Sequence, residues 1–313
     1  MPQIDTQKKI YEKADRDVTL VRVPADIEAI GYDAFTGTEV QHAILPDGLR
    51  TIGSSAFYDC DKLKVCVIPK TVDLIGDNAF YGCKKLELID VDNSSPYNQV
   101  IPKTVKSIGQ SAFAKCLTFT SVDFEASCSS VPSGCFYDCK RIDEFNLTGS
   151  TVEYIGANAF YDCSVMETIH LPKTLKTIGI NAFFNCKNLD HIDLPNTATM
   201  LYPGAFMNCF NMTYFKIDDA NKSELKIIGA NAFCNCEKIK AIVIPAKVEI
   251  IGEDAFNCCK SLEHVVFKDN TQIKLLDRVD KIFTECPSLR ILEFPDFMLV
   301  KDSLLKRWIK VDN

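Results

Sequence analysis

The chain has 313 residues, of which 47% are hydrophobic and 25% are charged, and its formal net charge is -7. This balance is typical of a globular protein, and the negative charge argues against nucleic acid or an anionic membrane as the main partner. No apolar run approaches 18 residues, and the first residues contain no apolar core of a signal peptide, so we expect no membrane insertion.

Residues 1–17 come before the first strand-like segment, and we expect them to form an N-terminal cap. Within them, residues 8–17 can form a short polar helix.

From residue 18 onward the chain is built on a repeated pattern. An Ala-Phe pair followed by Cys three residues later returns at intervals of 22 to 33 residues, with few departures. Ile-Gly commonly stands ahead of the pair, as in Ile52-Gly53, and a short apolar segment, often closed by Pro, follows the Cys. A period in the low twenties is typical of a solenoid of stacked turns, so we predict one domain over residues 18–296. The repeated phenylalanines are Phe35, Phe57, Phe80, Phe113, Phe136, Phe160, Phe183, Phe206, Phe233, Phe256 and Phe283.

The segment after each Cys predicts a short strand, because it is rich in Ile, Val and Phe and ends at a turn residue. About twelve such segments predict a right-handed stack of parallel strands with short helical turns on the opposite side. We expect Pro to direct the chain out of the sheet, and the Gly of Ile-Gly to adopt a positive φ at the next bend. The segments begin at Val18, Val40, Leu63, Leu86, Phe119, Ile142, Met166, Leu189, Met212, Ile239, Leu262 and Leu289.

Three longer intervals indicate insertions after a strand, at residues 92–100, 219–224 and 268–275. Insertions in such stacks become loops along one rim, which can be a binding rim or an indifferent surface. Residues 297–313 predict a C-terminal capping helix, with Leu304, Leu305, Trp308 and Ile309 on one face.

The unit resembles that of the BspA-like branch of the leucine-rich repeat superfamily, whose pattern is roughly I-G-x-x-A-F-x-x-C-x-x-L-x-x-I-x-L-P. The resemblance covers about residues 18–295 and departs at single turns, for example where Thr38 replaces the first Cys. It implies a curved solenoid with a parallel sheet on its concave side. It also implies a surface protein, an adhesin or binding protein, of gut or mucosal microbes and parasites.

Ten of the 15 cysteines hold the same repeat position and therefore form one column. Strand spacing alone permits a disulfide between neighbours, but pairing would break an evenly spaced column. We therefore expect small, buried, weakly donating thiols. The column consists of Cys60, Cys83, Cys116, Cys139, Cys163, Cys186, Cys209, Cys236, Cys259 and Cys286.

Of the other five cysteines, Cys66 and Cys135 replace core residues, and Cys128 lies outside the pattern. Cys234 and Cys258 stand beside column cysteines on consecutive turns and could bring four sulfurs together, the number that a structural zinc requires. Two of those sulfurs belong to the inward column, and the spacing is not C-x-x-C, so we predict no metal.

The strand positions that face outward carry the functional signal, because the repeat leaves them free to vary. Apolar residues stand near both ends of these columns and polar residues in the middle, and all four histidines fall in them. A contiguous exposed apolar surface indicates an interface, although Val and Ile also suit strands for their propensity alone. The predicted binding residues are His42, Val65, Val67, Leu88, Asp90, Asp123, Glu144, His170, His191, Asp193, Tyr214, Lys216 and His264.

His170, His191, Asp193 and Glu144 lie on predicted neighbouring strands and could hold a metal or act as acid and base. No phosphate loop, H-E-x-x-H or G-x-S-x-G accompanies them, and an open sheet excludes water poorly. We therefore predict no enzyme, no catalytic residue and no cofactor.

The sequence favours a non-catalytic protein that binds a protein or glycan ligand through its concave sheet, and the family resemblance implies a location at a cell surface or after secretion. The alternatives are a structural, self-assembling surface protein, a metal-binding protein, and a cytoplasmic location.

Overall fold

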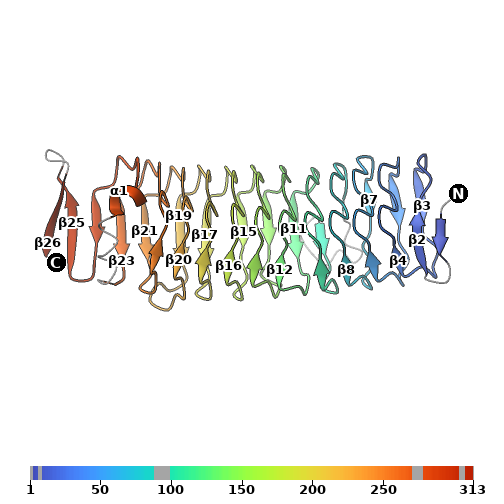
Figure 1. Cartoon of the computed structure of the whole chain (residues 1–313), viewed down its shortest axis with the longest axis horizontal. Coiled ribbons are helices and arrows are strands. Elements are labelled where there is room, and N and C mark those ends of the chain that lie inside the picture. Colours follow the sequence, from blue (N-terminus) through green and yellow to red (C-terminus); the bar gives the residue numbers. More distant parts are fainter. Residues whose placement is uncertain (1–2, 6–8, 88–98, 270–277, 303–306, 313) are drawn as a thin grey trace. The chain divides into compact units, whose positions relative to one another are not determined.

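The computed structural model describes residues 3–5, 9–87, 99–269, 278–302 and 307–312. Contacts divide the chain into two compact units, Met1–Pro172 and Lys173–Asn313. Each unit is a β-solenoid, in which successive turns of the chain stack short parallel strands on one another (Figure 1). The predicted fold class is thereby confirmed.

The strands that follow each Cys form what we call the first sheet. In the first unit they pair in parallel as β3-β5-β7 and as β9-β11-β13-β15. Their bounds are β3 (Leu20–Arg22), β5 (His42–Ile44), β7 (Val65–Cys66), β9 (Gln99–Ile101), β11 (Ser121–Phe124), β13 (Glu144–Asn146) and β15 (Thr168–His170).

In the second unit the first sheet begins with the pair β17-β19 and continues as β21-β23-β24-β25-β26. The strands are β17 (His191–Leu194), β19 (Tyr214–Ile217), β21 (Ala241–Ile244), β23 (His264–Phe267), β24 (Ile291–Glu293), β25 (Phe297–Lys301) and β26 (Trp308–Asp312).

A second sheet of two-residue strands was not predicted from the sequence. Most of its strands end on the residue before the repeated Gly, so the Ile of Ile-Gly belongs to a strand where we expected a bend. In the first unit β1 (Gln3–Asp5), β2 (Ile10–Lys13), β4 (Ala29–Ile30), β6 (Thr51–Ile52), β8 (Leu74–Ile75) and β10 (Ser107–Ile108) pair in that order, and β12 (Ser130–Val131) pairs with β14 (Tyr154–Ile155). In the second unit the order is β16 (Thr177–Ile178), β18 (Met200–Leu201), β20 (Ile227–Ile228) and β22 (Ile250–Ile251).

The Ala-Phe-x-x-Cys segments are turns, and the one α-helix among the described residues is α1 (Val279–Ile282). The repeated phenylalanines stack on one another inside each unit. Ring centroids are 4.6–5.7 Å apart from Phe35 to Phe160 and 5.2–5.4 Å apart from Phe183 to Phe283. Near-parallel rings at this separation add to the stabilisation from burial, and the stack forms the axis of the core.

The column cysteines are buried and link neighbouring turns. The Cys60 thiol donates to the Phe35 carbonyl of the preceding turn at 2.9 Å, and Cys139 donates to Phe113 in the same way at 3.2 Å. The same bond forms in the second unit, for example from Cys209 to Phe183. All 15 cysteines are free thiols. The residue is therefore used as a small donor that satisfies a buried carbonyl.

The glycines of Ile-Gly contradict the conformation expected for them, because none has a positive φ. They are required by close stacking instead: a Cβ on Gly53 would lie 2.6 Å from the Ile30 carbonyl oxygen of the preceding turn. The positive φ values fall later in the turn, on residues such as Asn78 and Asp59. Asn and Asp tolerate this conformation better than other non-glycine residues.

The N-terminal segment forms strands, so the helix predicted within residues 8–17 is wrong. Strand β2 pairs with the open edge of β4, and the Tyr11 ring stacks on Phe35 at 5.1 Å. Burial, followed by the charge of Asp15, raises the pKa of Tyr11. The edge of β4 offers backbone partners that an isolated polar helix would leave unused, and Tyr11 completes the aromatic stack.

The insertion predicted after the fourth strand lies between Glu87, which forms a parallel bridge with Val65, and strand β9. Strand β9 contains the last residues of that segment and pairs with β11, with Gln99 beside Val122. Of the site residues predicted on this turn, Leu88 and Asp90 lie outside the described residues, and Val100 takes the outward position. The signal was the repetition of V-I-P-K-T-V at 67–72 and at 100–105, which places the strand after the insertion.

The C-terminal helix predicted over 297–313 is also wrong. Strand β25 pairs antiparallel with β24, and β26 pairs antiparallel with β25. Phe297 stacks on Phe294 at 4.8 Å, and the edge of β24 supplies the hydrogen-bond partners, so the extended form is favoured over a helix. Leu304 and Leu305 lie outside the described residues.

The close approach at the repeated glycines predicts a large effect of a single methyl group. Gly53→Ala should lower the free energy of unfolding by about 1–3 kcal/mol, because the backbone of the preceding turn must move. Gly149→Ala is the matched control, since no atom lies within 4 Å of its added Cβ. Urea unfolding followed by circular dichroism measures both, and equal transition midpoints would contradict the stacking explanation.

Burial predicts that the column thiols from Cys60 to Cys259 are inert in the folded protein, whereas the contact with Cys259 lowers the pKa of Cys286. Desolvation raises the pKa of Cys139 to about 12, whereas the half-buried Cys258 has a pKa raised to about 11, mainly by its hydrogen bond to Glu285. Thiol reagents attack the thiolate. Labelling at pH 8 with mass spectrometry should therefore modify Cys258 first, and faster in Glu285→Ala, while all 15 thiols react in denaturant. If the column cysteines from Cys60 to Cys259 react as fast as Cys258, the turns open readily.

Candidate functional site

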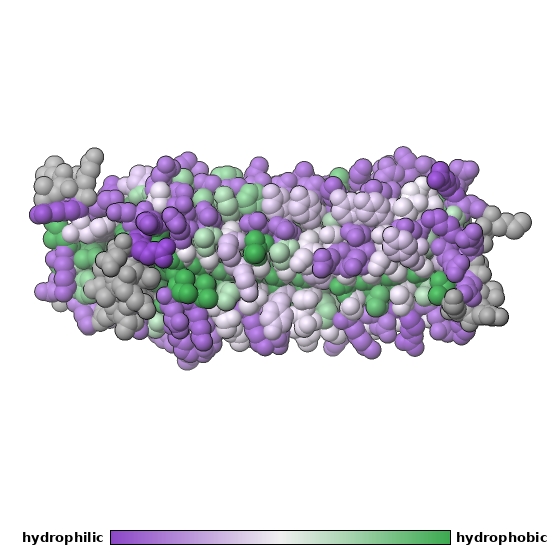
Figure 2. Space-filling view, in the orientation of Figure 1, coloured by the Kyte–Doolittle hydropathy of each residue, from purple (hydrophilic) through white to green (hydrophobic). Residues whose placement is uncertain are grey.

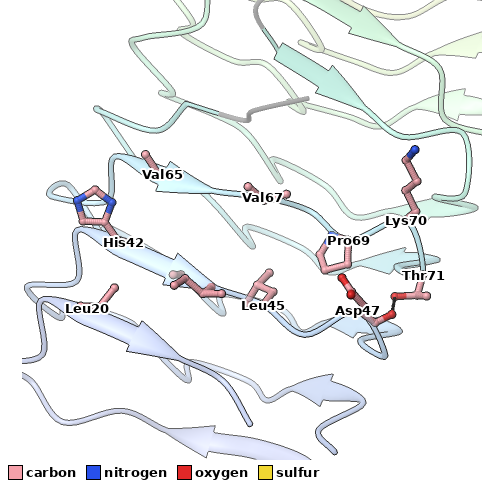
Figure 3. Close-up of a pocket in the computed structure, with 11 residues that line it drawn as sticks. Leu20, His42, Leu45, Asp47, Val65, Val67, Pro69, Lys70 and Thr71 are labelled. Carbon is pink, nitrogen blue, oxygen red and sulfur yellow. Dashed lines mark hydrogen bonds between the residues drawn. The ribbon is translucent and has the colours of Figure 1, made fainter. Parts of the chain in front are cut away.

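An apolar hollow lies on the outward face of the first sheet in the first unit (Figure 3). Its volume is about 680 Å³, and three neighbouring strands, β3, β5 and β7, supply its floor. The apolar lining consists of Leu20, Ala43, Ile44, Leu45, Val65, Val67 and Pro69.

Strand alternation explains why the side chains of Leu20, Ile44, Val65 and Val67 are outside. Val21, Ala43 and Cys66 point inward and are buried, so their neighbours along each strand point outward. Leu20 is 60% exposed and Ile44 is 40% exposed, which is high for residues of their size in a strand. The hollow thus presents apolar surface to solvent where the repeat does not require it.

The loops that follow β5 and β7 close one end of the hollow. Figure 3 shows Asp47, Pro69, Lys70 and Thr71 gathered at this end and His42 on the strand side. The Thr71 hydroxyl donates to the Leu49 carbonyl at 2.7 Å, which joins the two loops. The hollow therefore has apolar walls with charged groups at its margin, the usual composition of a recognition pocket.

Farther along the first unit the outward face is polar. His170 Nε2 lies 3.1 Å from Glu144 Oε1, and Asn146 donates to Asp123 at 3.1 Å. Of the residues predicted here, Glu144 and His170 are half-buried, whereas Asp123 is buried at 9% exposure. Asp123 is covered because its neighbour Asn146 lies across it, an effect that strand alternation alone does not predict.

In the second unit the predicted residues His191 and Tyr214 lie side by side on β17 and β19. Their rings stack at 4.9 Å, and His191 Nδ1 lies 3.3 Å from Asp190 Oδ2. Burial, and then the charge of Asp193, raises the pKa of Tyr214. Asp193 is in register with Lys216, and both are exposed. Together, His191, Asp193, Tyr214 and Lys216 form a polar, aromatic surface that is accessible to a partner.

The end of the second unit has its own apolar strip on this face. Val266 and Ile291 are half-buried, and Val300 and Ile309 continue the strip because they are in register with Ile291. The final strands therefore extend the face rather than cover it. The predicted residue His264 lies at its margin, with its Nε2 2.8 Å from Glu293 Oε2.

Sequence reasoning missed exposed apolar residues on the second sheet. Leu74 and Tyr154 in the first unit, and Ile250 in the second, are between 38% and 50% exposed. Figure 2 shows hydrophobic surface along the middle of one face, between hydrophilic margins. The signal was the variable residue ahead of the repeated Ile, a position that was not recognised as part of a strand.

Among the described residues, no group of three or more His, Cys, Asp or Glu side chains is placed to hold a metal ion. Three of the four cysteines considered for zinc form other hydrogen bonds: Cys236 and Cys259 donate to Phe carbonyls, and Cys258 donates to Glu285. In the part of the chain that the structure describes, no helix has the length and apolar character needed to cross a bilayer.

Comparison with solved structures supports the fold. A leucine-rich repeat protein of Bacteroides ovatus is 24% identical, with a TM-score of 0.66, over 89% of this chain and 73% of that one. A leucine-rich cell surface protein of Faecalibacterium prausnitzii is 22% identical, with a TM-score of 0.48, over 89% of this chain and 79% of that one. The pneumococcal vaccine antigen PcpA is 18% identical, with a TM-score of 0.47, over 88% of this chain and 78% of that one. The last two are too distant to support an inference, and no curated protein matches the chain.

The sequence also matches the family described as "BspA type Leucine rich repeat region", in three overlapping stretches at residues 7–99, 92–213 and 153–290. These stretches cover most of the chain and contain the Ile-Gly, Ala-Phe and Cys columns that build the two sheets and the stacked core. The chain belongs to the BspA-type leucine-rich repeat family.

Proposed function

We propose that this chain is a non-catalytic binding protein that recognises a protein partner at a cell surface, through the outward face of its first sheet. The observation that carries the proposal is the apolar hollow over β3, β5 and β7, in which Leu20 and Ile44 stay exposed. Burying such surface supplies most of the free energy of a typical protein interface.

The chemistry of the hollow favours a polypeptide over a glycan. Its floor is aliphatic, and charged groups occur only at the margin, on residues such as Asp47 and Lys70. An aliphatic or aromatic side chain of a partner would bury its whole surface there, whereas sugar hydroxyl groups would lose hydrogen bonds to water. On the second unit, one face of the Tyr214 ring is covered by His191, which leaves less ring surface for a sugar to stack on.

The polar stretches would give the interaction its orientation. Glu144 with His170, and Asp190 with His191, pair acidic and imidazole groups at a partly exposed surface. Such pairs contribute little to folding when they are exposed and are available to a partner. The family relationship agrees with a binding scaffold and gives no indication of catalysis. The cell-surface location rests on the resemblance to surface proteins of this family.

The hollow can be tested by placing a charge in it. Ile44→Asp should raise the dissociation constant for the partner about tenfold or more, because a carboxylate would be desolvated in an apolar contact. Leu74→Asp is the matched control, since Leu74 is 38% exposed in the same unit but lies on the second sheet. The measurement is surface plasmon resonance against an array of extracellular proteins and glycans, followed by titration of each hit. Equal affinity of the two variants for every hit would contradict a role of the hollow.

The second unit can be tested in the same array with His191→Ala combined with Tyr214→Ala. The pair is partly exposed, so we expect the melting temperature to remain nearly unchanged and the affinity to fall. Ile250→Ala is the control, because Ile250 is 50% exposed in the same unit but lies on the second sheet. A double variant that melts at a much lower temperature would show that the stacked rings support the fold rather than a partner.

A further inference from the structure

In the part of the chain that the structure describes, the outer edge of β26 is an open sheet edge. Strand β26 is the last in the order β21-β23-β24-β25-β26, and no strand among the described residues pairs with its outer side. An edge of this kind is a template for another strand.

The backbone groups on that edge can be identified from the hairpin. The Asp302 N–H donates to the Arg307 carbonyl at 2.9 Å. Antiparallel pairs alternate between bonded and non-bonded, so Ile309 and Val311 direct their N–H and C=O groups toward β25. The N–H and C=O groups of Trp308, Lys310 and Asp312 therefore point outward, away from β25.

The side chains of β26 divide between the two faces of the sheet. Ile309 and Val311 are 40% and 43% exposed, and they lie on the same face as Val300. On the other face Lys310 Nζ lies 4.6 Å from the centroid of the Phe297 ring and 3.6 Å from Asp312 Oδ1. The edge thus combines free backbone groups with apolar side chains and lacks a proline that would block pairing.

We propose that two copies of this chain pair edge to edge through β26, antiparallel about a two-fold axis at Lys310. This register places Trp308 of one copy opposite Asp312 of the second, and Ile309 opposite Val311. Every outward N–H and C=O of the strand then has a partner, and the four apolar side chains form one cluster. The interaction is separate from the partner binding proposed for the first unit.

Self-complementarity is what favours a second copy over an unrelated peptide. An isologous interface requires that each residue suit its symmetry mate, and β26 satisfies this with the apolar residues Ile309 and Val311, which are mates. Lys310 of one copy also lies diagonal to Asp312 of the second, which has the opposite charge. The one unfavourable contact is Lys310 against Lys310, which Asp312 of each copy partly offsets.

The test is the solution mass of the full chain, measured by analytical ultracentrifugation from micromolar to millimolar concentration. The wild type should shift from monomer to dimer. Lys310→Pro removes an outward N–H without breaking a bond to β25, so it should raise the dissociation constant of the dimer about tenfold or more. Lys310→Ala keeps that N–H and removes the like charge, so its dimer should be as stable as the wild type or more stable.

A second variant guards against misfolding of the proline variant. Val311→Lys leaves the backbone intact and places a charge opposite Ile309 of the second copy, so it should also weaken the dimer. Circular dichroism confirms the fold of each variant. A wild type that stays monomeric to millimolar concentration would overturn the proposal. The proposal would also be overturned if Lys310→Pro folds and dimerises as well as the wild type. If Lys310→Pro does not fold, the same result for folded Val311→Lys would overturn it.

Discussion

The contact between one turn and the next determines the rest of the structure. Phe rings stack at about 5 Å, the Cys thiol donates to the Phe carbonyl of the preceding turn, and glycine lets the backbones approach closely. All three contacts fit the spacing of adjacent strands. Because they are repeated in most turns, the outward side chains of the first sheet lie in fixed columns, and the function can depend on which residues occupy them.

The repeated features could be predicted from the sequence because the pattern remains recognisable across many copies even where a single copy departs from it. The Phe and Cys columns and the first sheet were recovered in this way. The features that occur once could not: the terminal strands depend on the open edges of β4 and β24, and tertiary pairing there outweighs local helix propensity. The second sheet was missed because a two-residue strand is too short to show alternation, and the glycine was assigned a turn conformation although it serves close packing.

The sequence predicted which residues of the candidate site face outward, but it did not predict the hollow that they form. Val65 and Val67 were recognised from alternation, whereas the closure of the hollow depends on loop residues such as Pro69 and Thr71, whose positions follow from a bond between neighbouring turns. The burial of Asp123 likewise results from Asn146 on the next strand. Side chains that meet across turns are far apart in the chain, so their contacts become visible only when the register is known.

The modular contact has an evolutionary consequence. A turn in the middle of either unit is held by its two neighbours through groups that every turn carries, so a duplicated or deleted unit can leave the Phe, Cys and Gly columns in register. Such a change would lengthen or shorten the recognition face in whole steps while the aromatic stack that ends on Tyr11 stayed intact. Variation in the number of repeats would thus change the length of the surface proposed to bind a partner, while the fold stays the same.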